Sequence, residues 1–246
     1  MEKGQNLKTK IIASTLSSLL ICGAAFADEI GEDWLEVAST SEFQWLGKKK
    51  SGEFTTLDNK KNNAYRYVIQ KLDKKEKTYQ YSQVIVELNA CKKGYGYVYY
   101  NNMEGKYTGH GAFVRFGPTV ADALGTMACL SWDHDTGKQS MVAKENAWEE
   151  VAVAGKSGNK WSLKNDTVRK VSYNNKPAVS VLFSYQSIAK KTVEYNEFVF
   201  LLSDCKRGYG VAYEQDFNGK LVEKNDVVLN GDSVLSSTIT ALCSKI

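Results

Sequence analysis

Hydrophobic and polar residues alternate as in β-strands over most of the chain. Residues 64–69 (Ala-Tyr-Arg-Tyr-Val-Ile) alternate and are rich in strand-forming residues, and residues 178–183 repeat this pattern. Residues 81–88 and 195–202 contain uninterrupted apolar runs, which predict central strands that are covered on both faces. Each run leads directly into a cysteine and a Gly-Tyr-Gly stretch, where the next strand is expected to begin.

The pattern changes to helical spacing at two places, residues 119–129 and 233–243. Thr119 and Ser233 are suited to cap the N-termini of these two helices. Turn residues between the preceding apolar segments predict that successive strands form antiparallel hairpins. The sequence therefore predicts an α+β fold class, and predicts the same unit twice: an antiparallel β-sheet followed by one short C-terminal helix.

The chain repeats itself at a fixed distance. A shift of 114 positions places Trp34 on Trp148 and residues 91–99 on residues 205–213, where six of nine residues are identical. This alignment needs no gap between Trp34 and Cys129. We therefore predict two tandem repeats. The predicted organisation is a leader at 1–27, repeat 1 at 28–129, a polar linker at 130–147 and repeat 2 at 148–246.

Four cysteines outside the leader support the duplication, because the spacing within each pair is 38 residues. They are Cys91, Cys129, Cys205 and Cys243. If both repeats fold alike, the bridges are Cys91–Cys129 and Cys205–Cys243. The exchanged pairing, Cys91–Cys243 with Cys129–Cys205, requires that the repeats swap their C-terminal elements. Each bridge should contribute on the order of 4 kcal/mol to the free energy of unfolding. The alternative to disulfide bonding is that the four cysteines are buried free thiols.

Residues 1–27 have the pattern of a signal peptide. Three lysines precede a short apolar stretch, and Ala25-Phe26-Ala27 supplies the small residues that signal peptidase requires, so we expect cleavage after Ala27. An uncleaved amphipathic helix is one alternative, and lipidation of Cys22 is another, although the preceding Ile21 is larger than a lipoprotein signal needs. An even number of remaining cysteines behind an export signal is typical of an oxidising compartment.

The spacing of tryptophans, cysteines and helix caps is similar to that of a known family. The residues are Trp34, Cys91, Gly117-Pro118-Thr119 and Cys129, then Trp148, Cys205, Gly231-Asp232-Ser233 and Cys243. With them, each copy resembles the surface-adhesin protein E domain of Gram-negative bacteria. The resemblance implies a single antiparallel sheet with a C-terminal helix, and adhesins that bind host extracellular-matrix proteins. This chain differs in being duplicated and in lacking a convincing lipoprotein signal.

Residues that could carry catalysis or hold a cofactor are sparse. Only two histidines occur, and the sequence contains no Gly-x-Ser-x-Gly, Walker or His-Glu-x-x-His motif. Residues 133–135 (Asp-His-Asp) look like a metal or acid–base cluster but occur in only one copy, so we interpret them as part of a solvated joint. A net charge of +4 does not indicate a nucleic-acid partner. We expect no enzyme activity, cofactor, metal site or transmembrane segment.

Tyrosines are the strongest hint of a binding surface. Those on the strands after the first cysteine of each copy share one face, and the candidates are Tyr95, Tyr97, Tyr99, Tyr209 and Tyr213. They could pack within the sheet, since aromatic residues suit strands, or form an exposed platform for a protein partner. We expect an exported binding protein of the periplasm or outer surface, resembling the adhesins, whose repeats pack as an intramolecular pseudo-dimer. The alternative is a periplasmic immunity protein or an inhibitor of a toxin or cell-wall enzyme.

Overall fold

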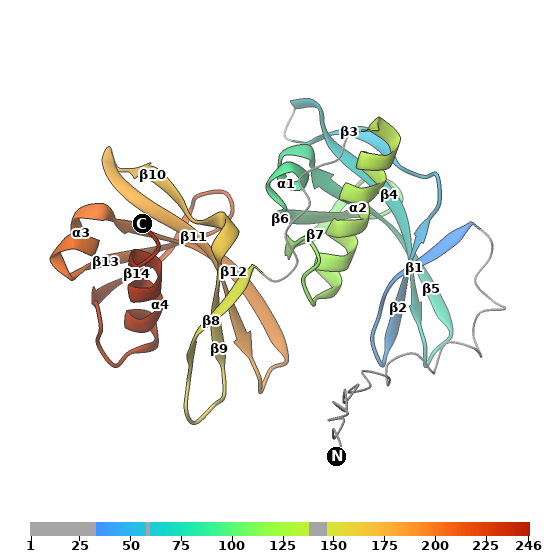
Figure 1. Ribbon diagram of the computed structural model, residues 1–246. Coiled ribbons are helices and arrows are strands. Elements are labelled where there is room, and N and C mark those ends of the chain that lie inside the picture. Colours follow the sequence, from blue (N-terminus) through green and yellow to red (C-terminus); the bar gives the residue numbers. More distant parts are fainter. Residues whose placement is uncertain (1–32, 58–59, 138–146) are drawn as a thin grey trace, which may run out of the picture.

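The computed structural model describes residues 33–57, 60–137 and 147–246, and contains two seven-stranded antiparallel sheets (Figure 1). The first sheet consists of β1 (Trp34–Ser39), β2 (Phe43–Lys48), β3 (Glu53–Leu57), β4 (Lys60–Asp73), β5 (Thr78–Glu87), β6 (Tyr95–Asn101) and β7 (Tyr107–Val114). The second consists of β8 (Trp148–Val153), β9 (Lys160–Lys164), β10 (Arg169–Tyr173), β11 (Lys176–Ser187), β12 (Thr192–Leu201), β13 (Tyr209–Gln215) and β14 (Leu221–Val228). The helices are α1 (Leu88–Lys93), α2 (Val120–Thr136), α3 (Leu202–Arg207) and α4 (Val234–Cys243), with a 3-10 turn at Asn165–Thr167.

Both sheets have the same strand order, β1-β2-β4-β5-β6-β7 and its counterpart β8-β9-β11-β12-β13-β14, with β3 and β10 added beside β4 and β11. This arrangement agrees with two tandem repeats. The gap-free alignment, however, is wrong in one segment. Trp45 lies opposite Lys71 and Trp161 lies opposite Tyr185, so β2 and β9 correspond at a shift of 116 rather than 114. The reason is that the hairpin joining β8 to β9 is longer than the one joining β1 to β2.

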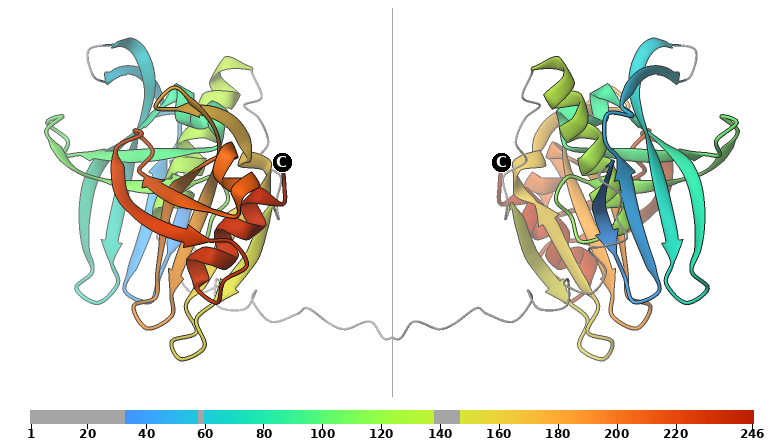
Figure 2. Two further views of the ribbon diagram at one scale, coloured as in Figure 1. Left: turned by 90° about the vertical axis from the view of Figure 1, so that its left-hand side faces the viewer. Right: turned by 90° about the vertical axis from the view of Figure 1, so that its right-hand side faces the viewer.

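One helix covers one face of each sheet, and the core lies between them. In repeat 1, α2 packs on the side chains that alternate along β4, β5 and β6, including Tyr67, Val84 and Val98. In repeat 2, α4 covers the corresponding side of its sheet, where Phe200 and Ile239 are fully buried. Figure 2 shows α2 and α4 on the same side of the molecule in both views. The structure is thus β-rich, with short helices, and agrees only broadly with an α+β label.

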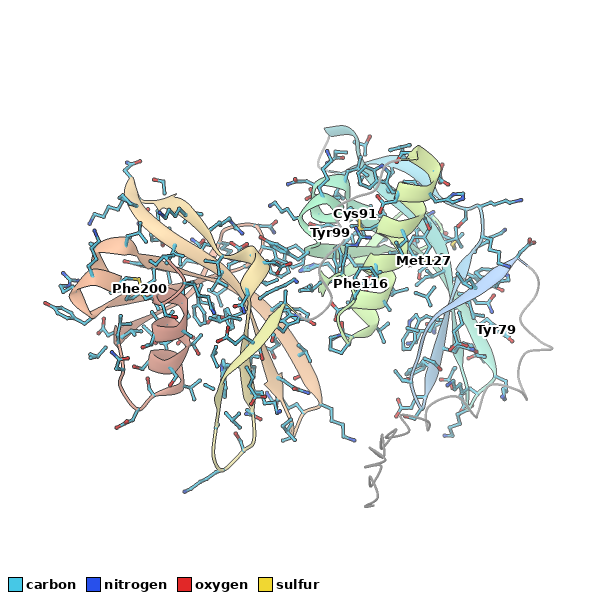
Figure 3. The ribbon with its side chains drawn as sticks, in the orientation of Figure 1. Tyr79, Cys91, Tyr99, Phe116, Met127 and Phe200 are labelled. Atoms are coloured by element: carbon cyan, nitrogen blue, oxygen red, sulfur yellow. A yellow bond between two sulfur atoms is a disulfide. The ribbon has the colours of Figure 1, made fainter. Side chains whose placement is uncertain are left out.

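The predicted disulfide pairing is confirmed. Cys91 is bonded to Cys129 and Cys205 to Cys243, each across 38 residues of sequence. The bonds join the short helices α1 and α3 to the long helices α2 and α4 (Figure 3). Each bridge therefore fixes the C-terminal helix to the end of the central strand of its own sheet.

The short helices α1 and α3 were not expected from the sequence, which predicted that each central strand leads directly into the next strand. Gly94 and Gly208 end these helices with φ values of 83° and 85°, the left-handed conformation that glycine adopts without strain. The central strands themselves are covered on both faces as predicted, since Val84, Ile85 and Val86 are at most 5% exposed.

Helix α2 is longer than predicted, because it continues past Cys129 to Thr136 and occupies part of the expected linker 130–147. The extension is stabilised by the burial of Trp132, which is 6% exposed in the core of repeat 1. Thr119 caps the helix as predicted, in a capping box with Asp122. Ser233 likewise accepts a hydrogen bond from the backbone N–H of Ser236 at the start of α4.

Replacing Gly125 with alanine is expected to destabilise repeat 1. A methyl group at this position of α2 would overlap the ring of Phe113, which is fully buried and cannot move aside. Overpacking of this kind costs about 1–3 kcal/mol, which outweighs the roughly 1 kcal/mol by which alanine favours a helix. Differential scanning calorimetry should show a lower Tm for Gly125→Ala. Gly155→Ala is the control because its site is open, and an unchanged Tm for Gly125→Ala would contradict the packing.

Candidate functional site

The face of each sheet that carries no helix, here called the open face, holds the tyrosines singled out from the sequence. Tyr95, Tyr97 and Tyr99 lie opposite Val114, Ala112 and His110 of β7. The rings of Tyr97 and Tyr99 have their centroids 6.2 Å apart, so the prediction that these tyrosines share one face of the sheet is confirmed.

Tyr95 is not part of an exposed platform, because it is only 5% exposed and contacts repeat 2. Its hydroxyl donates a hydrogen bond of 2.8 Å to Oε1 of Glu197 and accepts one of 2.8 Å from the guanidinium of Arg169. Arg169 and Glu197 also form an ion pair with each other. Burial, with a further contribution from the Glu197 carboxylate, raises the pKa of Tyr95 to about 12, so the phenol remains protonated and can donate.

A second polar contact between the repeats joins Tyr195 to Asp122. The hydroxyl of Tyr195 donates to Oδ2 of Asp122 over 2.9 Å, and the backbone N–H groups of Val114 and Thr119 donate to the same carboxylate. Burial raises the pKa of Asp122, and these hydrogen bonds oppose the rise. Asp122 thus caps the N-terminus of α2, accepts a hydrogen bond from the backbone of β7 and accepts another from Tyr195 of repeat 2.

Apolar side chains fill the space around these polar contacts. The buried members are Tyr95, Val114, Leu182 and Tyr195, and Ala112, Trp148, Val193 and Phe217 pack against them. Repeat 1 contributes the edge strand β7 and its neighbour β6, whereas repeat 2 contributes the central strands β11 and β12, together with Trp148 of β8 and Phe217 of the β13–β14 turn. A two-fold pseudo-dimer would bury the same residues from both repeats, so these contacts do not support an intramolecular pseudo-dimer.

Beyond the contact, four side chains of β6 and β7 form an aromatic cluster on the open face of repeat 1: Tyr97, Tyr99, Tyr107 and His110. The hydroxyl of Tyr107 lies 2.5 Å from Nδ1 of His110, and Tyr107 is 54% exposed. Phe217 of repeat 2 extends the cluster, with its ring centroid 5.5 Å from that of Tyr97.

The two candidate tyrosines of repeat 2 lie in different surroundings from those of repeat 1. Tyr209 is 53% exposed, and the guanidinium carbon of Arg207 lies 4.4 Å from the centroid of its ring. Tyr213 packs against Tyr173, with ring centroids 4.5 Å apart. The five candidates therefore do not form one surface, and their role in binding a partner stays a prediction.

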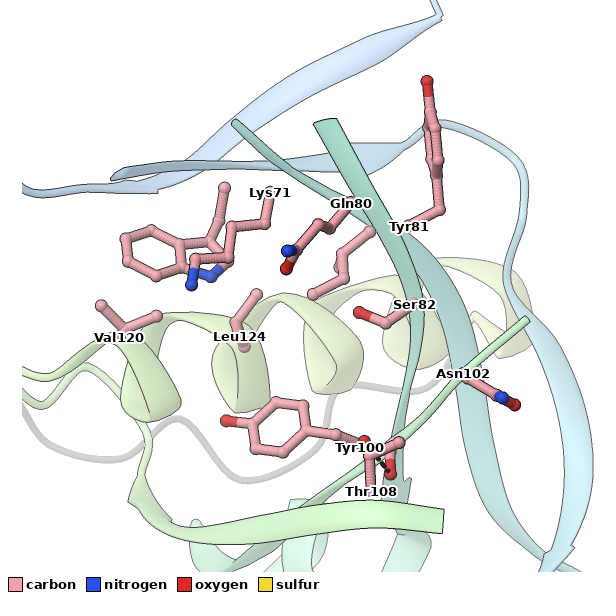
Figure 4. Close-up of a pocket in the computed structure, with 11 residues that line it drawn as sticks. Lys71, Gln80, Tyr81, Ser82, Tyr100, Asn102, Thr108, Val120 and Leu124 are labelled. Atoms are coloured by element: carbon pink, nitrogen blue, oxygen red, sulfur yellow. Dashed lines mark hydrogen bonds between the residues drawn. The ribbon is translucent and has the colours of Figure 1, made fainter. Parts of the chain in front are cut away.

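A hollow of about 670 Å³ lies on the helix side of the sheet in repeat 1, between the strands and the first turns of α2. Trp45 of β2 lines it, together with Lys71, Gln80 and Tyr100 of β4, β5 and β6, and Leu124 lines it from α2 (Figure 4). The ammonium of Lys71 lies 3.7 Å from the centroid of the Phe43 ring and 5.7 Å from that of Trp45. The side chain of Tyr81 points away from this space (Figure 4).

Repeat 2 has the equivalent hollow, but it is smaller, at about 210 Å³, and more acidic. Its lining residues are Trp161, Phe183, Tyr185, Glu194, Asn196 and Glu214, which occupy the positions of Trp45, Ile69, Lys71, Gln80, Ser82 and Tyr100. Phe183 stacks on Phe198 at 3.9 Å and fills space that is open in repeat 1. Burial, together with Glu223 and Glu194, raises the pKa of Glu214.

The Asp-His-Asp stretch lies on the last turns of α2 and not in a solvated joint. Asp133 pairs with Arg115 and Asp135 accepts a hydrogen bond from the hydroxyl of Tyr65, while the side chain of His134 is 88% exposed. In the described part of the chain, no group of three or more His, Cys, Asp or Glu residues could hold a metal ion. No described helix is both long and apolar enough to cross a membrane.

Arg169, Glu197 and both hollows were not predicted from the sequence. The hollows are lined by residues from several strands and a helix, so no local motif marks them. Arg169 and Tyr95 are 74 positions apart, and only the packing of the repeats brings them together. The predicted cleavage site after Ala27 and the alternative lipidation site Cys22 lie outside the described residues.

Comparison of the chain with protein families, with curated proteins and with solved structures finds no match.

Replacing Tyr95 with phenylalanine is expected to weaken the contact between the repeats. The change removes hydrogen bonds to two charged groups, and such bonds contribute about 1.5–3 kcal/mol each. Calorimetry should show a lower Tm, with the unfolding of the two repeats more widely separated. Tyr209→Phe is the matched control, because Tyr209 occupies the same position in repeat 2 but is exposed. Equal effects of the two changes, measured in dilute solution, would contradict the assignment.

Replacing Glu214 with glutamine is expected to stabilise repeat 2 at neutral pH. The raised pKa of Glu214 means that folding favours its protonated form, so this stabilisation is complete below the ordinary value of 4.5 and is lost as the pH rises through the folded value. Glutamine stays neutral and can still accept the hydrogen bond from Asn196. Urea unfolding from pH 4 to pH 8 should show a flatter profile for the variant, and a lower stability at neutral pH would refute this reading.

Proposed function

We propose that the chain is an exported, non-catalytic binding protein of the periplasm or outer surface of a Gram-negative bacterium. Two disulfides support export, because such bonds persist in oxidising compartments. The observation that carries the binding role is the aromatic cluster of Tyr97, Tyr99, Tyr107 and His110, which lies on a sheet face that no helix covers.

The aromatic cluster has the chemistry of a protein-binding surface. Tyrosine buries a large area at low entropic cost and is enriched among the residues that dominate binding energy. A hydrogen bond joins the side chains of Tyr107 and His110, which restrains both rings before a partner binds. Ordering a surface in advance reduces the entropy lost on binding. The partner proposed is a host matrix protein, as the resemblance of the sequence to adhesins suggests.

Alanine replacements in the aromatic cluster test this role. The disulfide-bonded chain is measured against a panel of purified host matrix proteins by biolayer interferometry. Tyr99→Ala and Tyr107→Ala should each weaken the observed binding about tenfold or more, the usual effect of removing a dominant contact. Phe54→Ala is the control, since Phe54 is a similarly exposed aromatic residue that lies on the helix side of the sheet, against Tyr65.

Two outcomes would reject the adhesin role: absence of binding to every matrix protein, or binding that neither tyrosine variant weakens. The same protein is also assayed for inhibition of toxins and cell-wall enzymes secreted by the producing cell. Inhibition without matrix binding would establish the immunity or inhibitor role instead.

A further inference from the structure

The contact between the repeats joins two different surfaces, and a duplicated chain possesses each surface twice. The edge surface of repeat 1 consists of Tyr95, Ala112 and Val114 on β6 and β7. The central surface of repeat 2 consists of Trp148, Leu182, Val193, Tyr195 and Glu197 on β8, β11 and β12. Because the repeats share strand order and register, repeat 2 has its own edge surface and repeat 1 its own central surface.

The unused edge surface of repeat 2 is exposed. Tyr209 and Val228 face each other across β13 and β14, as Tyr95 and Val114 do across β6 and β7. Tyr209 is 53% and Val228 66% exposed, whereas Tyr95 is 5% and Val114 0% exposed. Two large apolar side chains at the edge of a sheet are thus left uncovered in repeat 2 where repeat 1 buries them.

The unused central surface of repeat 1 keeps the layout of its counterpart. Trp34 and Tyr81 have ring centroids 6.1 Å apart, and the corresponding Trp148 and Tyr195 are 5.9 Å apart. Tyr81 is 51% exposed, whereas Tyr195 is 6% exposed. Tyr79, at the position of Val193, is 46% exposed and lies on the side of repeat 1 that faces away from repeat 2 (Figure 3).

Polar side chains occupy the corresponding positions in repeat 1, although the residue types differ. Gln83 occupies the position of Glu197, and its amide oxygen Oε1 is buried without a hydrogen bond from any described residue. The positions of Arg169 and Ser180 are occupied in repeat 1 by Glu53 and Arg66, which form an ion pair with each other. An incoming tyrosine would therefore meet a polar surface at the position of Glu197, with the charged groups of Glu53 and Arg66 beside it in sequence register.

We propose that the edge surface of repeat 2 docks on the central surface of repeat 1 of a second copy of this chain, repeating the internal contact. In this contact Tyr209 of one copy lies against Gln83 of the next, as Tyr95 lies against Glu197 within the chain. The two surfaces differ and lie on different repeats, so the contact is heterologous and copies associate head to tail, as open chains or closed rings. The occupant is a second copy because a partner of this shape is already seated on the equivalent surface within the chain.

The test uses the disulfide-bonded chain of residues 28–246 in sedimentation velocity over a range of concentrations. The wild type should show a mass that rises with concentration. Tyr81→Glu places a charge on the central surface of repeat 1, and Val228→Glu places a charge on the edge surface of repeat 2. Because either charge would be buried in the contact, each variant alone should remain a monomer. Tyr79→Glu serves as a second variant of the central surface. Leu130→Glu on α2 is the control, because Leu130 is 45% exposed but lies on neither surface.

Mixing the two variants distinguishes a head-to-tail contact from pairing of like surfaces. Tyr81→Glu retains its edge surface and Val228→Glu retains its central surface, so an equimolar mixture should form dimers and nothing larger. Pairing of like surfaces would leave at least one single variant able to associate by itself. Near-ultraviolet circular dichroism confirms that each variant is folded.

Three results would overturn the proposal. The first is a wild type that stays monomeric up to about 1 mM, where a specific contact should be detectable. The second is undiminished association of either folded variant alone. The third is a mixture of the two variants that shows no dimer.

Discussion

A single helix can cover only one face of a sheet, and this constraint governs the arrangement of the whole molecule. Both sheets have buried apolar side chains on the open face as well as under the helix. Ile85 of β5 and Val199 of β12 point to the open face and are only 5% and 3% exposed, whereas the residues before and after each of them point to the helix. Burying such a face stabilises the fold by about 25 cal/mol for each Å² removed from water. The two repeats bury part of each other's open face, and the parts that remain exposed are the ones available to partners.

Within each repeat, the disulfide holds the C-terminal helix against its sheet. The helix sequences are poor helix formers, with Gly125 in one and several serines and threonines in the other, so packing must hold them in place. The bridge joins each of these helices to the end of a central strand, where α1 and α3 turn the chain. The two hollows on the helix side of the sheets differ in volume and in the charge of the residues that line them.

Local features were predictable from the sequence, and features that depend on distant residues were not. The helix caps Thr119 and Ser233 follow from side-chain chemistry within one turn, and the disulfide pairing follows from the duplication. The extension of α2 depends on the burial of Trp132, which only the folded core provides. The shared face of Tyr95 and Tyr97 follows from strand alternation, but the burial of Tyr95 does not, because Glu197 lies 102 positions away. Of the aromatic cluster, Tyr97 and Tyr99 were predicted from the sequence, whereas Tyr107 and His110 were not.

The contact of Tyr95 and Val114 with Leu182 and Tyr195 should hold the two repeats in one fixed orientation. Residual dipolar couplings of backbone amides, recorded on the disulfide-bonded chain in dilute solution, measure the orientation of one repeat relative to the other. We expect both repeats to share one alignment tensor, with α2 and α4 on the same side of the molecule as in Figure 2. Two tensors of different magnitude, one for each repeat, would contradict it.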